Sequence, residues 1–330
     1  MPDQEINTDL PNSFELLDFE LAKALKQCSE IGLLWDDIPA ARVIEAEMLE
    51  EFKSELPPVT GVTTSDHRVS GSVNSPEVPV RIYRPENYSD ALPALLWIHG
   101  GGYVMGSIET ADYVIKQLVE SVGCVVVSVE YRLAPEHPFP AAIDDCYSAL
   151  QWLFSHADEL GVDKSRIAIG GVSAGGGLAA CLAIMVRDRS EIPVMFQILM
   201  CPMLDERSET HSSYSITDPR VWNRDCNLRG WEAYLGQKIG DRKVSPYAAA
   251  ARADDLRNLP PAYISVGSLD LFIDENIHYN QRLIQAGVPA EMHIFSGAFH
   301  AFEFQVLSAQ ISLRAWAMHY EILKQAFKSI

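Results

Sequence analysis

The sequence has few features that would direct the chain into a membrane, out of the cell or onto a nucleic acid. Its first twenty residues have no basic start and no apolar core, so we expect no secretory signal. The longest apolar stretches, such as residues 193–204, are shorter than the roughly 20 residues that cross a bilayer. The 26 basic residues are outnumbered by 45 acidic ones, and a net charge of −19 repels nucleic acid and anionic membranes. We therefore expect no nucleic acid and no stably bound membrane as a partner.

Cysteines at the spacing of a metal or redox site are also missing. The six cysteines show no CxxC pair, and several stand in apolar runs. They are Cys28, Cys124, Cys146, Cys181, Cys201 and Cys226. This pattern is typical of free buried thiols in a reducing compartment, so we expect a cytoplasmic protein without a metal site.

What is present is the composition of a globular protein. The chain has 330 residues, of which 48% are hydrophobic and 22% charged, so one large domain with an insertion, or two domains, is expected. Residues 1–60 hold 14 acidic and 4 basic side chains, which accounts for 10 of the 19 net negative charges. The amino-terminal segment is therefore a distinct acidic layer.

The first part of the chain is predicted to be helical and then to change to strands. Residues 14–25 and 40–56 read as helices, and Ile44, Met48 and Phe52 recur every four residues in the second one. Two prolines end that helix. Residues 59–84 contain short β-prone runs with turn residues between them, which predict antiparallel strands at the start of a sheet.

From residue 92 onward, buried strands are expected to alternate with helices. The apolar runs are residues 94–98, 124–129, 166–169, 194–200, 262–266 and 290–295. Runs of this kind suit strands buried on both faces of a parallel sheet. Helical patterns lie between most of them, including residues 141–160, 176–188 and 275–287, the last with Gly287 as its expected cap. The fold class is therefore α/β, with a mostly parallel central sheet and helices on both faces.

One interval interrupts this alternation. Residues 205–247 show short helical patches but no buried strand, so we expect an insertion above the carboxyl edge of the sheet. Together with residues 1–58 it would form a helical cap. Residues 59–204 and 248–330 would then form the catalytic domain.

The stretch IAIGGVSAGGGLAA, residues 167–180, places one serine among five glycines and has three interpretations. A phosphate-binding P-loop requires lysine where Gly176 stands, so that interpretation fails. A dinucleotide fingerprint is matched by Gly175, Gly177 and Ala180, but it begins too far after the strand and lacks the acidic residue that binds ribose. The third interpretation is a catalytic serine, and it depends on partners elsewhere in the chain.

That third interpretation takes Gly171, Ser173 and Gly175 as a GxSxG motif between a strand and a helix. A nucleophilic serine in this motif sits on a tight, strained turn, where small neighbours allow close backbone approach. A serine hydroxyl also needs a base and preorganised donors for the oxyanion.

The donors are predicted in a glycine run that follows residues 94–98. The sequence HGGGY supplies His99, Gly100, Gly101 and Gly102, whose small side chains leave backbone N–H groups accessible. We assign the oxyanion hole to the N–H groups of Gly101, Gly102 and Ala174, the last being the residue after Ser173. His99, with Gly100, is expected to support this loop, because the catalytic histidine should follow the serine in the chain.

The base and the acid are predicted in two loops near the carboxyl terminus. His300 follows residues 290–295 in a loop, whereas His293 lies inside that run and reads as structural. Asp270 follows residues 262–266 and is placed to accept the histidine Nδ1–H. We expect Asp274 to be a helix N-cap and Glu275 to lie in the first helical turn.

Taken together, HGGGY, GVSAGGG, SLDLFIDE and FHAF resemble, in that order, the bacterial hormone-sensitive-lipase-like esterases (family IV) of the α/β-hydrolase fold. The long segment 126–153 is also similar to that family's sequence. The resemblance covers about residues 70–305 and departs at Val172, where the commonest family motif has aspartate and a minority subgroup has an uncharged residue. That departure leaves any subgroup-specific substrate preference open.

The resemblance implies a serine carboxylesterase that hydrolyses small-molecule esters with short to medium acyl chains. It also implies a Ser173–Asp270–His300 triad, a helical cap, no cofactor and a possible homodimer. Two alternatives remain: a catalytically silent binding protein on the same fold, as plant gibberellin receptors are, and an amidase or lactonase. Retention of all three triad residues argues against the binding protein.

Arg132 and three aromatic residues also stand near predicted site segments. Arg132 is expected to form a structural ion pair with a carboxylate. The aromatic side chains of Trp222, Trp231 and Tyr234 could line an acyl pocket, although such clusters more often belong to a core.

Overall fold

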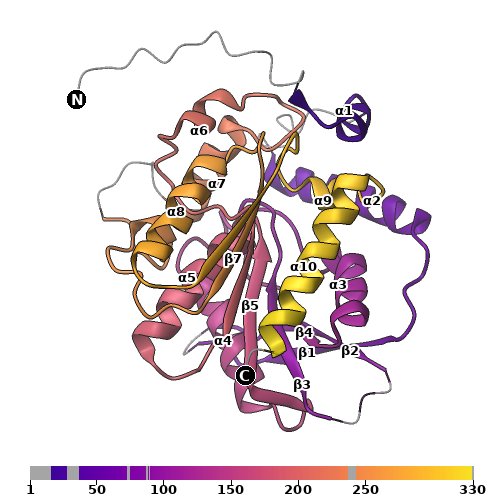
Figure 1. The fold of residues 1–330 in the computed structure, drawn as a ribbon, viewed down its shortest axis with the longest axis vertical. Coiled ribbons are helices and arrows are strands. Elements are labelled where there is room, and N and C mark those ends of the chain that lie inside the picture. The colour runs from indigo at the N-terminus through magenta and orange to yellow at the C-terminus, as the bar shows by residue number, and fades with distance from the viewer. Residues whose placement is uncertain are drawn as a thin grey trace.

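A central sheet runs through the molecule and carries helices on both faces (Figure 1). The structure is a computed structural model, and it describes residues 16–27, 37–72, 75–86, 88, 90–236 and 243–328. In these residues the sheet has eight strands in the order β1-β2-β4-β3-β5-β6-β7-β8. Their bounds are β1 Val62–Val69, β2 Val78–Pro85, β3 Leu92–Ile98, β4 Val125–Val129, β5 Val162–Val172, β6 Phe196–Met200, β7 Ala262–Gly267 and β8 Ala290–Phe295.

The sheet is parallel except at its beginning. β1 pairs with β2, and β2 with β4, in antiparallel register, whereas β4, β3, β5, β6, β7 and β8 pair in parallel. The predicted antiparallel opening and the parallel strands that follow are therefore confirmed. The carboxyl ends of the parallel strands meet at one edge, which is where loops can form a site.

One expectation about strand burial is wrong. Residues 290–295 were expected to be buried on both faces, but β8 is the last strand of the sheet, and Phe295 is its one fully buried residue. Its alternating polar residues, such as Glu291 and His293, agree with this edge position. By contrast, every residue of β3 and β4 is buried, as a central parallel strand requires.

The helices form two layers that pack through separate apolar clusters. One face of the sheet packs on α4, α5 and α8, and the other packs on α3 and α10 (Figure 1). The bounds are α1 Phe19–Leu25, α2 Ile38–Glu55, α3 Ile108–Val122, α4 Ala141–Ser155, α5 Ala174–Arg189, α6 His211–Ser215, α7 Arg224–Leu235, the 3-10 helix η3 Ala250–Arg252, α8 Ile273–Gln285, α9 Phe302–Gln305 and α10 Gln310–Lys328. Gly287, with a φ of 79°, follows the end of α8, in the left-handed conformation expected after a helix. No helix in the described part of the chain is both long and apolar enough to cross a bilayer.

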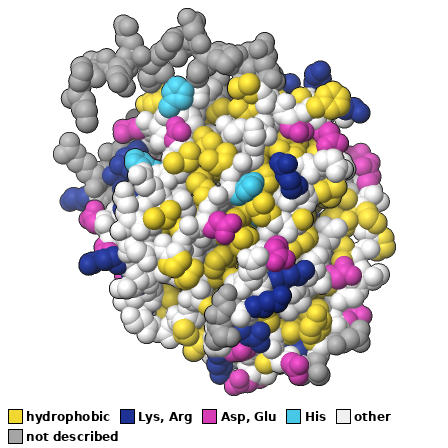
Figure 2. Space-filling model, viewed as in Figure 1, with side chains coloured by type: hydrophobic (Ala, Val, Ile, Leu, Met, Phe, Trp, Pro, Cys, Tyr) yellow, Lys and Arg dark blue, Asp and Glu magenta, His cyan; other side chains and the backbone are white. Residues whose placement is uncertain are grey.

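The predicted amino-terminal helices are present as α1 and α2, although residues 14 and 15 lie outside the described part. The apolar side chains that recur along α2 do not face the core: Ile44, Met48 and Phe52 are 41%, 60% and 38% exposed. Figure 2 shows apolar side chains mixed with charged ones over the face of the molecule that is in view. The side of α2 that contacts the rest of the protein mixes apolar and charged residues: Ile38, Ala41, Arg42, Glu45, Leu49 and Lys53.

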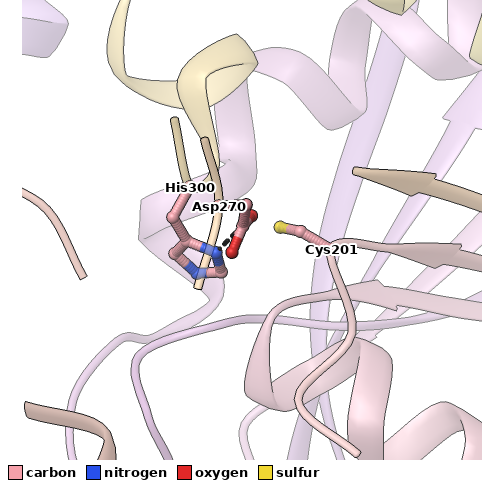
Figure 3. Close-up of side chains that lie close together, drawn as sticks. All are labelled: Cys201, Asp270 and His300. Carbon is pink, nitrogen blue, oxygen red and sulfur yellow. Dashed lines mark hydrogen bonds and ion pairs between the residues drawn. The ribbon is translucent and has the colours of Figure 1, made fainter. Parts of the chain in front are cut away.

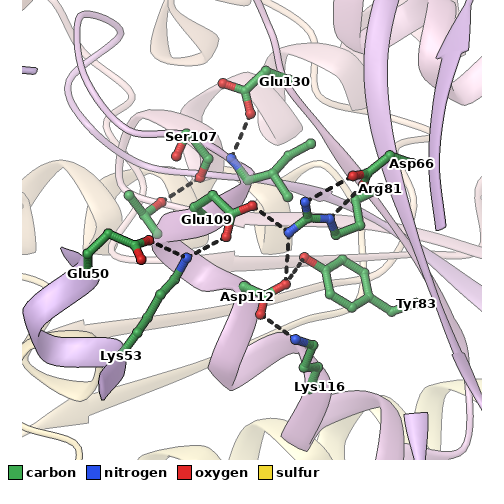
Figure 4. A network of polar contacts seen from close by, with 12 residues as sticks. Glu50, Lys53, Asp66, Arg81, Tyr83, Ser107, Glu109, Asp112, Lys116 and Glu130 are labelled. Atoms are coloured by element: carbon green, nitrogen blue, oxygen red, sulfur yellow. Dashed lines mark hydrogen bonds and ion pairs between the residues drawn. The ribbon is translucent and has the colours of Figure 1, made fainter. Parts of the chain in front are cut away.

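Charged contacts attach α2 to the sheet and to α3 (Figure 4). Lys53 of α2 binds Glu109 at the start of α3, and Arg81 of β2 binds the same glutamate at 2.7 Å. Arg81 also pairs with Asp66 of β1 at 2.7 Å and with Asp112 of α3 at 3.1 Å. This network joins the acidic amino-terminal layer to two strands and a helix.

The interval 205–247 contains α6 and α7 and no strand among its described residues, as the sequence predicted; residues 237–242 lie outside the described part. The expected structural ion pair is also present. Arg132, in the loop after β4, binds the carboxylate of Asp145 through Nε and Nη2, each at 2.8 Å. The side chain of Asp145 is 1% exposed, so this charge is fully buried and depends on its partner.

Candidate active site

Ser173 lies at a sharp turn between β5 and α5. Its φ of 56° and ψ of −120° are strained for a residue with a side chain, and its N–H donates to the carbonyl of Met200 on β6 at 2.8 Å. The helix begins at the next residue, Ala174. The turn therefore holds the serine hydroxyl at the carboxyl edge of the sheet, at the amino terminus of a helix.

The glycines around Ser173 allow other parts of the backbone to come very close. A Cβ atom on Gly175 would lie 2.1 Å from the carbonyl oxygen of Ile98, and one on Gly171 would lie 2.4 Å from the same oxygen. A Cβ atom on Gly177 would lie 2.1 Å from the carbonyl oxygen of Met203. The glycine-rich sequence is thus required by packing of the turn and of α5 against β3 and the β6 loop.

The structure brings the three predicted triad residues together. The Ser173 hydroxyl donates to Nε2 of His300 at 2.9 Å, and Nδ1–H of His300 donates to Oδ2 of Asp270 at 2.8 Å. We assign this tautomer because an ionised carboxylate can only accept a hydrogen bond. Ser173, Asp270 and His300 are 4%, 0% and 5% exposed, so bulk water barely competes with these bonds.

The loop that carries Asp270 also begins α8. Oδ1 of Asp270 accepts the N–H of Phe272 at 2.9 Å, which leaves Oδ2 directed at the histidine. The ring of Phe272 packs edge-on against His300 with centroids 5.1 Å apart. The acid is therefore oriented by a backbone donor, and the imidazole is held by an apolar contact as well as by its hydrogen bonds.

The neighbouring acids have structural contacts, but one assignment is wrong. Asp274 is not the N-cap of α8, because the helix begins at Ile273; its carboxylate accepts the N–H of Ser212 in α6 at 2.7 Å. Glu275 lies in the first turn as expected, is fully buried and accepts the N–H of Leu204 at 2.7 Å. Both acids join α8 to the segment that leads into the insertion.

The glycine loop after β3 lies beside Ser173. Gly101 and Gly102 have φ values of 113° and 59°, and among the described residues no backbone carbonyl accepts their N–H groups. Ala174 is the first residue of α5, so its N–H has no partner within the helix. Gly101 and Gly102 line the same cavity as Ser173, and Ala174 directly follows Ser173 in the chain, so their assignment as oxyanion donors stays a prediction. Gly100 belongs to the same loop.

His99 precedes this loop and is fully buried. Its ring stacks on Tyr131 with centroids 4.2 Å apart, and its Nδ1 lies 2.7 Å from the carbonyl oxygen of Gly100. Burial lowers the pKa of His99 to about 4, so the ring is neutral at physiological pH. A neutral histidine donates Nδ1–H to that carbonyl and fixes the direction of the loop.

These groups open into one cavity of about 220 Å³. It is lined by Ser173, His300 and the glycine loop, with apolar side chains around them. The lining residues are Glu45, Gly100, Gly101, Gly102, Met105, Gly106, Thr110, Ala111, Val172, Ser173, Trp222, His300, Ala301, Phe304 and Gln305. Val172, at the position where the sequence departs from the common motif, is part of this wall.

The three aromatic residues of the insertion have different environments. Trp222 lines the cavity, and its ring lies 6.1 Å from that of His300. Trp231 and Tyr234 are fully buried and pack against Tyr103 instead, with centroids 5.2 and 4.0 Å away. One of the three therefore contacts the site, and the other two belong to the core, as aromatic clusters commonly do.

Cys201 lies on the side of Asp270 that is away from His300 (Figure 3). Among the described residues, the possible metal-ligand atoms of Cys201, Asp270 and His300 lie within 4.8 Å of one another. Burial and the charge of Asp270 raise the pKa of the Cys201 thiol well above its ordinary value, so the sulfur is protonated and poorly suited to bind a metal. The described cysteines, 124, 146, 181, 201 and 226, are all free and buried, as expected; Cys28 lies outside the described residues.

Several residues near the site were not identified from the sequence. Glu45 of α2 and Phe304 and Gln305 of α9 line the cavity, although each is distant in the chain from Ser173. Glu303 of α9 is 3% exposed, and its Oε2 has no hydrogen-bond partner. Burial raises the pKa of Glu303 to about 7, and the charge of Asp270 acts in the same direction. These α9 residues belong to the stretch FHAFEFQ, residues 299–305, in which the sequence pattern identifies only His300 as a candidate catalytic residue.

A family model described as the α/β hydrolase fold matches residues 95–304 of the chain. This match covers the glycine loop, the serine turn, Asp270 and His300. The chain belongs to the α/β-hydrolase family. The resemblance to its hormone-sensitive-lipase-like esterases is confirmed, as is the fold class.

Two curated relatives and one solved structure show how far this hydrolase resembles known members. It is 37% identical to esterase LipI of Mycobacterium tuberculosis over 235 residues, which is 70% of this chain and 73% of the relative. It is 35% identical over 262 residues to carboxylesterase NlhH from the same species, covering 79% and 82%. The structure of a bacterial heroin esterase has a TM-score of 0.92 and 40% identity, covering 96% of the hydrolase and all of that chain.

Proposed function

We propose that this carboxylic ester hydrolase cleaves short- to medium-chain esters through Ser173, His300 and Asp270. The observation that carries the proposal is the continuous pair of hydrogen bonds from Ser173 to His300 and from His300 to Asp270, at the edge of a cavity. Serine carboxylesterase activity agrees with the esterases among its relatives. The cavity is largely apolar, as acyl chains require.

In the first half of the reaction, Ser173 Oγ attacks the ester carbonyl carbon while Nε2 of His300 takes the hydroxyl proton. The oxyanion that forms accepts hydrogen bonds from the N–H groups of Gly101, Gly102 and Ala174. Asp270 stabilises the imidazolium. The carbon–oxygen bond to the alcohol then breaks, and His300 gives its proton to the departing oxygen, which leaves an acyl group on Ser173.

In the second half, His300 takes a proton from water, and the hydroxide attacks the acyl carbon. The same three N–H groups bind the second oxyanion. When this intermediate breaks down, the bond to Ser173 Oγ is cleaved, His300 returns a proton to the serine, and the carboxylic acid leaves. No group outside the protein and the water is needed to balance these steps.

A series of aryl esters of increasing acyl length tests the substrate range. The cavity of about 220 Å³ predicts the highest kcat/KM for acyl chains of about two to eight carbons. A steady rise toward long-chain esters, or no preference within the series, would contradict this part of the proposal.

Two alternatives use the same fold. A silent binding protein would leave a fluorophosphonate probe unreacted, because such probes modify only an activated serine. An amidase or a lactonase would use the same residues on another acyl group, so the ratio of amide, lactone and ester turnover at matched acyl structure separates these from an esterase.

We also propose that residues 1–58 and 205–247 form a cap over the catalytic domain of residues 59–204 and 248–330. The position of Glu45 and Trp222 in the cavity wall supports a role of both segments at the site. The free buried cysteines support a cytoplasmic location. A homodimer is proposed from the family resemblance alone, and sedimentation of the purified protein tests it.

A further inference from the structure

Glu45 places a carboxylate in the wall of the cavity that contains Ser173. It comes from α2, and its Oε2 accepts the N–H of Gly106, in the glycine loop, at 3.0 Å. The side chain is half-buried, so the charge is partly removed from water without being sealed in the core. A charge in this position is exposed to whatever occupies the cavity.

No cation of the protein is paired with this carboxylate among the described residues. The nearest candidate, Arg42, lies one turn earlier on α2, and its Nη1 and Nη2 bind the two carboxylate oxygens of Glu136 at 3.0 and 2.9 Å. Its Nε and Nη2 also donate to the carbonyls of Val104 and Ala134, each at 2.8 Å. Arg42 is therefore committed to other acceptors and acts on Glu45 through its charge without forming an ion pair with it.

The environment of Glu45 penalises its charge. Burial raises its pKa, and the hydrogen bond from Gly106 and the charge of Arg42 offset this only in part. A bound cation would relieve the penalty, since an ion pair replaces the lost hydration.

The rest of the cavity would suit an alkylated cation. The described residues that line it include no lysine or arginine, and His300 is the one other ionisable side chain. Trp222 and Phe304 add aromatic rings to the wall, which can contact alkyl groups and attract a cation to a ring face. The net charge of −19 for the whole chain would also attract cationic substrates.

We propose that this esterase selects esters that carry a cationic amine or quaternary ammonium group, and that Glu45 binds that group. The inference rests on the proposed function, because the ester bond of the same substrate must reach Ser173. It names Glu45 as a residue that determines specificity and not as a participant in proton transfer.

The test compares esters that differ only in charge. Acetylcholine and 3,3-dimethylbutyl acetate have nearly the same shape, but the first bears a positive nitrogen where the second bears a carbon. Ethyl 4-(trimethylammonio)butyrate and ethyl 5,5-dimethylhexanoate form the matching pair with the charge on the acyl side. In at least one pair, wild-type kcat/KM should favour the cationic ester by about tenfold, and added salt should reduce this ratio.

The deciding variant is Glu45→Gln, whose amide oxygen can still accept the N–H of Gly106 while the charge is gone. The ratio of kcat/KM between the cationic and the neutral ester should fall by about tenfold in this variant. Glu47→Gln, which removes an exposed carboxylate from α2 outside the cavity wall, is the control and should leave the ratio unchanged.

Three outcomes overturn the inference: a wild-type ratio near one in both pairs, an unchanged ratio in Glu45→Gln, or an equal fall of the ratio in Glu47→Gln. These outcomes leave the proposed function intact, since the neutral esters are still hydrolysed. If Ser173→Ala hydrolyses the neutral esters as fast as wild type, the proposed function fails instead, independently of any charge preference.

Discussion

The Cα atom of Gly102 stands directly against the indole of Trp222: a Cβ atom added to Gly102 would lie 2.2 Å from Cη2 of the ring. This contact joins the glycine loop after β3 to the segment before α7. It means that one residue of the proposed oxyanion hole is positioned by a side chain of the proposed cap. Gly102 also has a φ of 59°, which residues with a side chain rarely adopt.

Gly102→Ala should therefore reduce kcat/KM for a short aryl ester by about 100-fold. The new methyl group must displace Trp222 or the loop, and either movement misplaces a donor of the oxyanion hole. The measurement is steady-state hydrolysis at constant pH, with the fold checked by circular dichroism.

Gly287→Ala is the matched control, because it also places a side chain on a residue with a positive φ but does so away from the cavity. Gly287 has a φ of 79°, but a Cβ atom there would meet nothing within 4 Å, and the residue is not part of the cavity wall. It should lose about 1 kcal/mol of unfolding free energy while kcat/KM stays unchanged. Equal kinetic losses in both variants would show that Gly102 has no special part in catalysis.

Asp270→Asn should lower kcat by about 10⁴-fold at neutral pH, because an amide in place of the carboxylate favours the wrong histidine tautomer and stabilises the imidazolium less. The fold should survive, since the asparagine oxygen can still accept the N–H of Phe272. Single-turnover measurement of acylation detects the loss at the step where it is expected.

Asp274→Asn provides the comparison. Asp274 lies four residues after Asp270, and its carboxylate accepts the N–H of Ser212. The amide oxygen of an asparagine at this position can accept the same hydrogen bond. Its kcat should stay close to that of wild type. A loss similar to that of Asp270→Asn would mean that the helix start, and not the histidine partner, limits catalysis.

The sequence predicted that Ser173, Asp270 and His300 come together, because the signal for each of them is local. Ser173, Asp270 and His300 each follow a recognisable apolar run, and parallel strands bring their carboxyl ends to one edge. The strands were also predictable, since burial on both faces leaves continuous apolar runs. The edge position of β8 was not predicted, although the alternation of Glu291 and His293 with apolar residues was a signal for it.

The wall of the cavity could not be predicted in the same way. Glu45 stands in a helix whose apolar pattern suggests that Ile44 and Met48 face the core, whereas both are exposed and a side that mixes apolar and charged residues packs inward. Similarly, nothing local distinguishes Trp222, at the cavity, from Trp231, in the core. These assignments depend on tertiary contacts between segments far apart in the chain.

The buried pair of Arg132 and Asp145 should matter for stability. Arg132→Ala leaves the Asp145 carboxylate buried without its cation, and this should cost about 3–5 kcal/mol of unfolding free energy. Urea denaturation measures the change. Arg257→Ala, which breaks an exposed pair with Asp255, should change the unfolding free energy far less, and equal costs would contradict the account.

Glu303 should make the protein less stable as the pH rises. Its folded pKa of about 7 lies above the ordinary value of 4.5, so between these pH values the folded state holds a proton that the unfolded state has released. The protonated Glu303 carboxyl therefore adds to the unfolding free energy at pH 4, and this contribution is lost by pH 8. Glu303→Gln has no titrating group at this position. The unfolding free energy of the variant minus that of wild type should therefore increase by about 3 kcal/mol from pH 4 to pH 8.

Denaturation of both proteins at pH 4, 6 and 8 gives this difference directly, and other titrating groups cancel in the comparison. A difference that is constant with pH would mean that the Glu303 carboxyl is not strongly perturbed. A difference of the opposite sign would mean that the carboxylate is stabilised in the folded state.

The central claim is that Ser173 carries the acyl group, and one measurement tests it most directly. Wild-type protein and Ser173→Ala are each mixed with a slowly deacylating aryl ester, quenched in acid, and their intact masses and peptide masses are determined. The account predicts that wild type gains the mass of one acyl group, located on Ser173, and that the folded variant gains none and does not turn over. Acylation at another residue, or full turnover by Ser173→Ala, would contradict it.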